Sequence, residues 1–312
     1  MEALSNTTRR LTAHHLCFAV FSILLIALFR TPLGALLKLS FTDDKYSHVL
    51  LIPVMSVSLV YFRRRIAFAS ARFCFSKGIS LLVVGIGVSW LAQEHLTSLR
   101  GQDLLSVVVL SIVLLWIAGF LLCYGAQSFR AALFPLFFLL LMIPIPTVVL
   151  EGIVLGLQKG SAVMTYGLFK LLGVPVLWRH FKFLLPGVEI EIAEECSGIR
   201  SSLALFITSM LAGYLFLQST WRRAVFSLLT VPVVILKNAA RIVTISSLGV
   251  YVDPGFLHGR LHRYGGLPFS LVSLAILVPL FLALQRSERG CEQSKLPTEP
   301  VSQGVPKQVP AF

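Results

Sequence analysis

Apolar runs of the length needed to cross a lipid bilayer recur along the whole chain and decide its fold class. A transmembrane helix needs about 20 mostly apolar residues. Only 13% of the 312 residues are charged, against about a quarter in soluble domains. The sequence therefore predicts an all-α polytopic membrane protein with about eight transmembrane helices, its partner being the lipid bilayer. The predicted spans cover about 11–29, 47–62, 79–93, 103–123, 131–149, 197–217, 224–250 and 266–285.

Basic residues in the short connections predict the orientation. Cytoplasmic loops of membrane proteins are enriched in Lys and Arg, which accounts for the excess of 27 basic over 14 acidic residues without a nucleic-acid partner. If both termini are cytoplasmic, three groups of arginines lie on the cytoplasmic side of the membrane: those at 63–65, at 222–223 and in 286–289. This count requires the amphipathic, glycine-containing stretch 150–171 to be interfacial or re-entrant rather than a full crossing.

The stretch 173–195 differs from the apolar spans around it. Apolar and acidic residues alternate from Val188 to Ile192, and Pro186-Gly187 supplies a turn. This pattern predicts a short external β-hairpin before Cys196. Residues 286–312 are rich in Pro, Gln, Ser and charge, and we expect a disordered cytoplasmic tail after a transmembrane domain at 1–285.

One of the five cysteines, Cys196, stands at the boundary of an apolar run with ionisable neighbours. The cysteines are scattered and form no CxxC pair, so we expect no disulfide framework, no metal site and no other cofactor. Cys196 lies in Glu194-Glu195-Cys196-Ser197-Gly198-Ile199-Arg200, where an apolar run begins. The first turn of a helix favours negative charge, so a thiolate forms there more readily. The alternative is an ordinary packing cysteine.

Arg241 lies inside the seventh predicted span, where an arginine costs at least about 2.5 kcal/mol unless it is paired or hydrated. We expect it roughly 14 Å below the external end of that span, at 1.5 Å per residue. Asn238 is one turn earlier on the same face and could hold the guanidinium. From helical phase we expect Lys237 to point elsewhere and to extend towards the interface. A structural ion pair of Arg241 with Glu194 or Glu195 is the competing interpretation.

Two histidines, His258 and His262, fall in the predicted external loop before the last span. A thiol, a guanidinium and an imidazole are thus expected on the same side of the membrane. Arg200 lies one turn after Cys196. We interpret it first as a partner of Glu194 or Glu195, and otherwise as a group that stabilises the thiolate.

Several ordered motifs of the chain resemble those of the exosortase/archaeosortase family of membrane cysteine transpeptidase-proteases. The matching segments are Asp44-Lys45-Tyr46-Ser47-His48, Arg63-Arg64-Arg65, Ile143-Pro144-Ile145-Pro146, EECSGIR at 194–200, Asn238-Ala-Ala-Arg241 and His262-Arg-Tyr-Gly265-Gly266. The family commonly has glycine after the early Ser-His, where this chain has Val49. The second histidine fits better because two glycines follow it closely, but His258 stays an alternative.

The resemblance implies an activity and a set of site residues. It implies a cysteine peptidase or transpeptidase in the bacterial cytoplasmic membrane, with Cys196 as nucleophile and Arg241 and His262 as partners. It implies substrates that are secreted proteins with a C-terminal, PEP-CTERM-like sorting signal, cleaved at the outer face through a thioester. The supporting residues are then Glu195, Ser197, Gly198, Arg200, Asn238 and His258. The alternatives are a polytopic transporter and a membrane acyltransferase or scaffold subunit of polysaccharide export.

Overall fold

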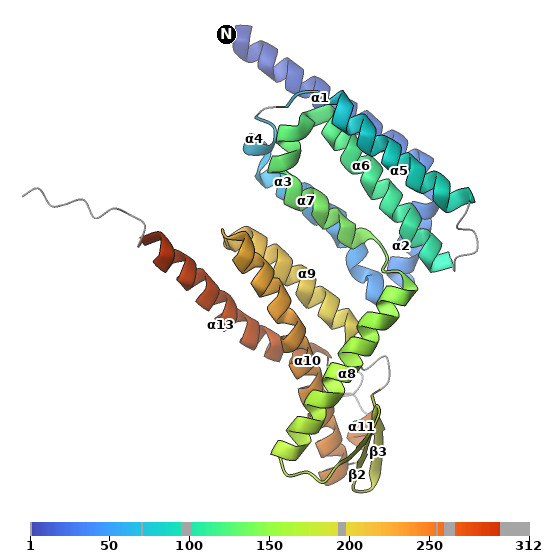
Figure 1. Cartoon of the computed structure of the whole chain (residues 1–312), viewed down its shortest axis with the longest axis vertical. Helices are drawn as coiled ribbons and strands as arrows, with labels where there is room; N and C mark the ends of the chain where they lie inside the picture. Colours follow the sequence, from blue (N-terminus) through green and yellow to red (C-terminus); the bar gives the residue numbers. More distant parts are fainter. Residues whose placement is uncertain are drawn as a thin grey trace, which may run out of the picture.

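The computed structural model is a bundle of long helices with one small sheet (Figure 1). It describes residues 2–69, 71–94, 101–192, 198–253, 255–258 and 266–293, with no side-chain detail for 2–10, 257, 258, 266, 267 and 290–293. Within these ranges, eight helical segments are long and apolar enough to cross a membrane. They are Leu11–Leu28, Asp44–Phe62, Phe75–Glu94, Gly101–Ala131, Thr147–Leu171, Ile199–Phe216, Thr220–Tyr251 and Pro268–Arg289. The predicted class, an all-α polytopic membrane protein, is confirmed.

The elements follow the chain in a simple order. The N-terminal part consists of α1 (Glu2–Leu28), α2 (Arg30–Thr42), η1 (Asp44–Leu50), α3 (Leu51–Phe62), α4 (Arg64–Ala67), α5 (Phe75–Glu94), α6 (Gly101–Ala131), α7 (Leu133–Phe138) and η2 (Leu139–Met142). The C-terminal part consists of α8 (Thr147–Leu171), β1 (Leu177–Arg179), β2 (Lys182–Leu185), β3 (Val188–Glu191), α9 (Ile199–Phe216), α10 (Thr220–Tyr251), α11 (Gly255–His258) and α13 (Gly266–Gln293).

The two parts have separate apolar cores. In the first, α1 and α5 lie along α6, and the buried residues Tyr46, Ile52, Val113 and Phe138 join η1, α3, α6 and α7 (Figure 1). In the second, α8, α9 and α13 pack around α10. Ile207 of α9 reaches into the first core and links the two parts.

The predicted span over 131–149 is not one continuous helix. The chain there forms only α7 and the 3₁₀ turn η2, ten residues in all, and then breaks before α8. Ile143 is extended, with φ −72° and ψ 124°, and Pro146 precedes the first residue of α8. Proline lacks a backbone N–H and disfavours helical geometry in the residue before it. The two prolines therefore split the apolar run that hydropathy alone joined.

The stretch 150–171, expected to be interfacial or re-entrant, forms one uninterrupted helix. α8 is a continuous helix of 25 residues with a mean hydropathy of 1.3, long enough to span. The glycines that suggested a break are tolerated within it, since a helical glycine costs only about 1 kcal/mol. One of them, Gly160, lets Ile235 of α10 pack closely. By length and composition alone, the candidate spans number eight among the described residues, with α8 included and 131–149 not.

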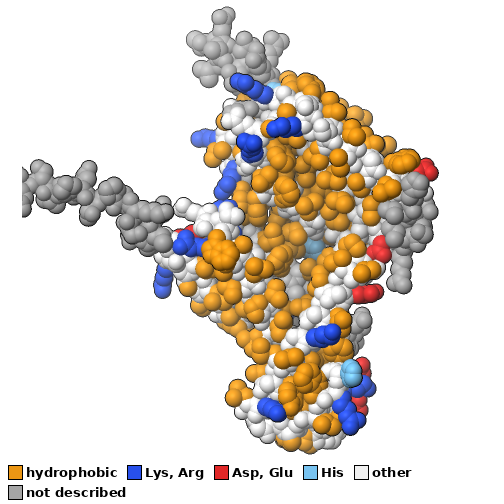
Figure 2. All heavy atoms as spheres, viewed as in Figure 1, with side chains coloured by type: hydrophobic (Ala, Val, Ile, Leu, Met, Phe, Trp, Pro, Cys, Tyr) orange, Lys and Arg blue, Asp and Glu red, His pale blue; other side chains and the backbone are white. Residues whose placement is uncertain are grey.

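Arginine-bearing connections meet at one end of the bundle, which we call the basic end. The Arg63 and Arg223 guanidinium groups lie 4.5 and 5.2 Å from the Tyr214 ring centroid, so the end of α3, the end of α9 and the start of α10 are neighbours. Arg222 Nη1 lies 3.6 Å from Glu288 Oε1 near the end of α13. Figure 2 shows Lys and Arg side chains along the upper left edge, beside an otherwise apolar surface.

Carboxylates mark the opposite end, which we call the acidic end. Asp103, in the first turn of α6, accepts from the Thr147 backbone N–H at 2.6 Å and from its hydroxyl at 2.7 Å, capping α8. Arg200 Nη1 in the first turn of α9 donates to Asp44 Oδ2 of η1 at 2.5 Å. The starts of η1, α6, α8 and α9 therefore lie together, and α9 runs from the acidic end to the basic end.

Small residues of α5 allow close contact with α6 and provide a first testable prediction. A Cβ on Gly85 would lie 2.9 Å from the Leu115 side chain, whereas a Cβ on Gly87 would meet nothing within 4 Å. We expect Gly85→Leu to lower stability by about 1–3 kcal/mol through overpacking. Gly87→Leu, on the same helix, should have little effect. Thermal unfolding of the two variants in detergent checks this, and equal melting temperatures would contradict it.

The predicted β-hairpin exists and is larger than expected. β2 pairs with β3 around the Pro186-Gly187 turn, where Gly187 has φ +78°, and β1 adds a third antiparallel strand. Phe183 is fully buried against the core formed with α8 and α10. On the exposed side, the Glu189 carboxylate accepts a hydrogen bond from Lys182. This hydrogen bond raises the pKa of Lys182. The sheet thus lies against the two helices that, with α9, form the candidate site.

The last helix is longer than predicted. α13 continues to Gln293, past the boundary at 285 where we placed the start of a disordered tail. Residues 294–312 lie outside the described residues.

Candidate active site

The first turn of α9 is held in a specific geometry directly after the cysteine-bearing segment. Gly198 is the N-cap, with φ +73°, a left-handed conformation that glycine adopts at low cost. Its carbonyl accepts hydrogen bonds from the Ser201 hydroxyl at 3.0 Å and the Ser202 hydroxyl at 2.7 Å. A Cβ at Gly198 would lie 3.5 Å from Asn238 Oδ1. The start of α9 therefore touches α10 at Asn238.

This contact places Arg241 relative to α9. From Thr220 to Asn238, α10 rises roughly 27 Å, the same length as the 18-residue α9 beside it. α10 then continues to Tyr251, so its end is not level with the start of α9. Arg241 is one turn past Asn238 and about 4.5 Å further along the axis. It therefore lies near the level of the α9 N-terminus, and about 15 Å before the end of α10, in agreement with the roughly 14 Å predicted from the end of that span.

α8 supplies a buried polar face that the sequence analysis missed. Gln158, Ser161 and Thr165 are buried at helical spacing. Asn238 Nδ2 donates to Ser161 Oγ at 3.0 Å, and Gln158 Nε2 donates to the Ile192 carbonyl at 3.1 Å. α8 therefore fixes Asn238 and also the chain just before the segment 193–197. The signal was present as polar residues at i, i+3 and i+7, but amphipathicity alone does not tell a protein-facing stripe from a water-facing one.

Lys237 does not extend towards the interface as predicted. Its side chain is only 3% exposed, and Nζ donates to the Ser201 hydroxyl of α9. Two adjacent residues of α10 thus contact different elements. Asn238 lies against α8 and beside Gly198, while Lys237 contacts the first turn of α9.

Arg200 has a partner besides the two glutamates expected for it, Glu194 and Glu195, which lie outside the described residues. It pairs with Asp44, in the early Asp-Lys-Tyr-Ser-His motif, and both side chains are well exposed. An exposed ion pair contributes only about 0–1 kcal/mol, so it aligns η1 with α9 more than it stabilises the fold.

Several predicted site residues lie outside the described residues: Glu195, Cys196, Ser197 and His262. The backbone of His258 ends α11, which contacts the end of α10, but its side chain is not described. The structure therefore brings together Gly198, Asn238 and the helix turn that carries Arg241. Within the described residues, no group of three or more His, Cys, Asp or Glu side chains could hold a metal ion.

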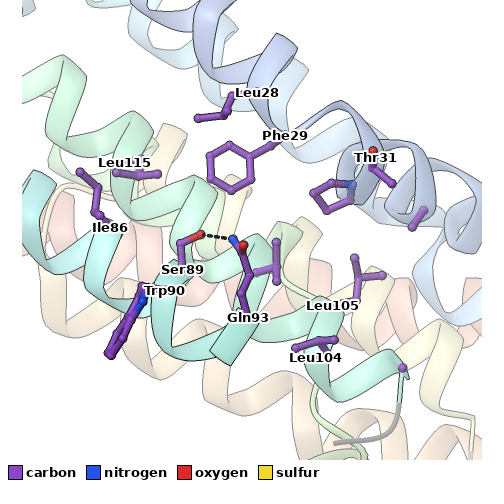
Figure 3. Close-up of a pocket in the computed structure, with 14 residues that line it drawn as sticks. Leu28, Phe29, Thr31, Ile86, Ser89, Trp90, Gln93, Leu104, Leu105 and Leu115 are labelled. Carbon is purple, nitrogen blue, oxygen red and sulfur yellow. Dashed lines mark hydrogen bonds between the residues drawn. The ribbon is translucent and has the colours of Figure 1, made fainter. Parts of the chain in front are cut away.

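A cavity of about 820 Å³ lies elsewhere, between α1, α2, α5 and α6 (Figure 3). Its lining is mostly apolar, with Trp90 and the Gln93–Ser89 hydrogen bond of 3.3 Å as polar features. Among the described residues, none of the predicted site residues lines it. It is therefore separate from the candidate active site.

Comparison with known proteins agrees with the motifs. The sequence model described as transmembrane exosortase matches residues 38–279, which include η1, the CSGxR segment, the Asn238–Arg241 turn and both histidines. No curated protein and no solved structure gives a significant match. Because the match covers well over half of the chain, the protein belongs to the transmembrane exosortase family.

Proposed function

We propose that this exosortase-family protein is a membrane cysteine protease or transpeptidase. Its substrates would be secreted proteins with a C-terminal, PEP-CTERM-like sorting signal, cut at the outer face of the bacterial cytoplasmic membrane. Cys196 is the nucleophile, Arg241 stabilises the oxyanion and His262 transfers protons, with His258 as the alternative.

The contact of Gly198 with Asn238 carries this proposal. Cys196 is two residues before Gly198, so chain geometry keeps their Cα atoms within about 7 Å. Arg241 is one turn from Asn238 on the same side of α10, where residues three apart are neighbours. The thiol and the guanidinium are therefore restricted to one small region at the acidic end.

The charge distribution supports the outer face as the site of reaction. Cytoplasmic ends of membrane proteins are rich in Lys and Arg, and here the arginines at 63, 222 and 223 mark the basic end. The start of α9 is at the other end. A scissile bond just outside a substrate's own membrane span would lie at that level.

The reaction proceeds as acyl transfer. The Cys196 thiolate attacks the scissile carbonyl carbon, and Arg241 stabilises the negative charge that develops on its oxygen. Collapse of the intermediate breaks the C–N bond, and His262 protonates the departing amine. A thioester remains on Cys196. The imidazole then deprotonates water or an acceptor amine, which attacks the thioester and releases the thiolate.

Co-expression with a tagged substrate tests the function. The substrate is a secreted protein with a C-terminal sorting signal, a membrane span, a basic end and a cytoplasmic tag. We expect the tag to be lost only when the chain is present, seen as a mobility shift. A substrate whose sorting signal is scrambled but whose span is kept is the control. Equal processing of both would contradict recognition of the signal.

External thiol modification separates this function from its rivals. A variant with Cys196 as its only cysteine should lose processing when cells are treated with a membrane-impermeant maleimide. A transporter, or an acyltransferase or scaffold subunit, would have no need of this thiol. Unchanged processing after complete labelling would favour those classes.

A further inference from the structure

A buried lysine beside the candidate active site has no role in the proposed reaction. Lys237 is inside the span Thr220–Tyr251, yet its side chain is only 3% exposed. Burial of an ammonium group within a membrane span is costly, so such residues are retained for a reason. Asn238, next to it, is part of the family motif; Lys237 is not.

The contacts of Lys237 lead to the turn that precedes α9. Its ammonium donates to the Ser201 hydroxyl, and that hydroxyl donates to the Gly198 carbonyl at 3.0 Å. A hydroxyl that accepts from a cation is a stronger donor, because hydrogen bonds in a chain polarise one another. The charge of Lys237 thus strengthens the hydrogen bond from the Ser201 hydroxyl to the Gly198 carbonyl.

Ser202 and Asn238 also hold the turn at Gly198. Ser202 donates to the Gly198 carbonyl through its backbone N–H at 2.9 Å and its hydroxyl at 2.7 Å. Asn238, fixed by Ser161 of α8, closes the space next to the Gly198 α-carbon. Two consecutive residues of α10 therefore determine where the left-handed turn lies.

We propose that Lys237 is a positioning residue that acts through Ser201 to hold the Gly198 turn, and so the start of α9, in the geometry that cleavage requires. This inference rests on the proposed function, because the effect is expected in the cleavage reaction. It assigns Lys237 no contact with the substrate. A small displacement of a reacting group is enough to slow a reaction by about 100-fold.

Lys237→Met tests the proposal, because methionine keeps the apolar stem and removes the charge. With purified protein in detergent and a sorting-signal substrate, we expect kcat to fall by about 10- to 100-fold with little change in KM. The melting temperature should stay equal or rise, because loss of a buried charge removes a desolvation cost. A purely structural lysine would instead give a lower melting temperature and an unchanged kcat. Lys159→Met, at an exposed position of α8, is the matched control and should behave like the unmodified chain.

A double-mutant cycle with Ser201→Ala tests the route. If Lys237 acts through Ser201, the double variant should be no slower than the more damaged single variant. Additive losses would overturn this route, and a wild-type kcat for Lys237→Met would overturn the proposal itself. Failure of the underlying function is distinguishable: the unmodified protein would then not cleave the substrate, or Cys196→Ala would still cleave it. Cleavage by Cys196→Ala that is lost in Ser201→Ala would make Ser201 a nucleophile with Lys237 as its base, and would overturn both proposals.

Discussion

Cys196→Ala should abolish processing of the sorting-signal substrate while the protein still inserts and accumulates normally. Loss of a nucleophile removes the covalent route, and residual rates fall by on the order of 10³-fold or more. Cys196→Ser should be nearly as inactive, because a serine hydroxyl is not ionised near neutral pH as an activated thiol is. The measurement is the mobility shift of the co-expressed substrate, normalised to the amount of membrane-inserted variant.

The other cysteines provide the controls for this experiment. Cys74, in the connection between α4 and α5 at the basic end, is far along the bundle from the start of α9. Cys74→Ala removes a thiol of the same kind and should leave processing unchanged. Undiminished processing by a well-inserted Cys196→Ala variant would rule out Cys196 as the nucleophile.

The sequence was sufficient for the parts of the fold that depend on local chemistry. Apolar length predicted the number of spans, and alternation around Pro186-Gly187 predicted the strands, because both patterns act within one segment. The number of residues between Gly198 and Asn238 also indicates that the two positions lie at the same level of the bundle. An 18-residue helix, a short connection and the return along α10 bring these two positions to the same level.

Long-range partners could not be predicted in the same way. Nothing local links Asp44 with Arg200, which are 156 positions apart. The polar face of α8 was visible in the sequence, but its exposure was misjudged because α10 covers it. Lys237 was assigned to the interface on helical phase, and phase cannot tell that Ser201 of α9 would be there. The split at Pro144 and Pro146 was local, yet a hydropathy window averages across it.

Arg241→Lys should reduce processing by about 10²- to 10³-fold, the usual cost of losing one oxyanion donor, with little loss of protein. Lysine keeps the positive charge but not the planar, forked donor geometry of arginine, so a group that must meet a developing oxyanion suffers most. Arg241→Gln should be at least as inactive, since it also removes the charge. Processing per inserted molecule and the melting temperature in detergent are the two measurements.

Arg223 lies on the same helix and separates catalysis from structural pairing. Its Nε donates to the Leu217 carbonyl at 2.8 Å, and its guanidinium lies over the Tyr214 ring at the basic end. Arg223→Lys loses a directed hydrogen bond of the kind that Arg241 would lose in a purely structural role. It should lower the melting temperature while processing per molecule survives. If Arg241→Lys gives this same pattern, Arg241 is a structural charge partner and another group must stabilise the oxyanion. If only its cleavage rate falls, Arg223 serves stability and Arg241 serves chemistry at two different levels of the same helix.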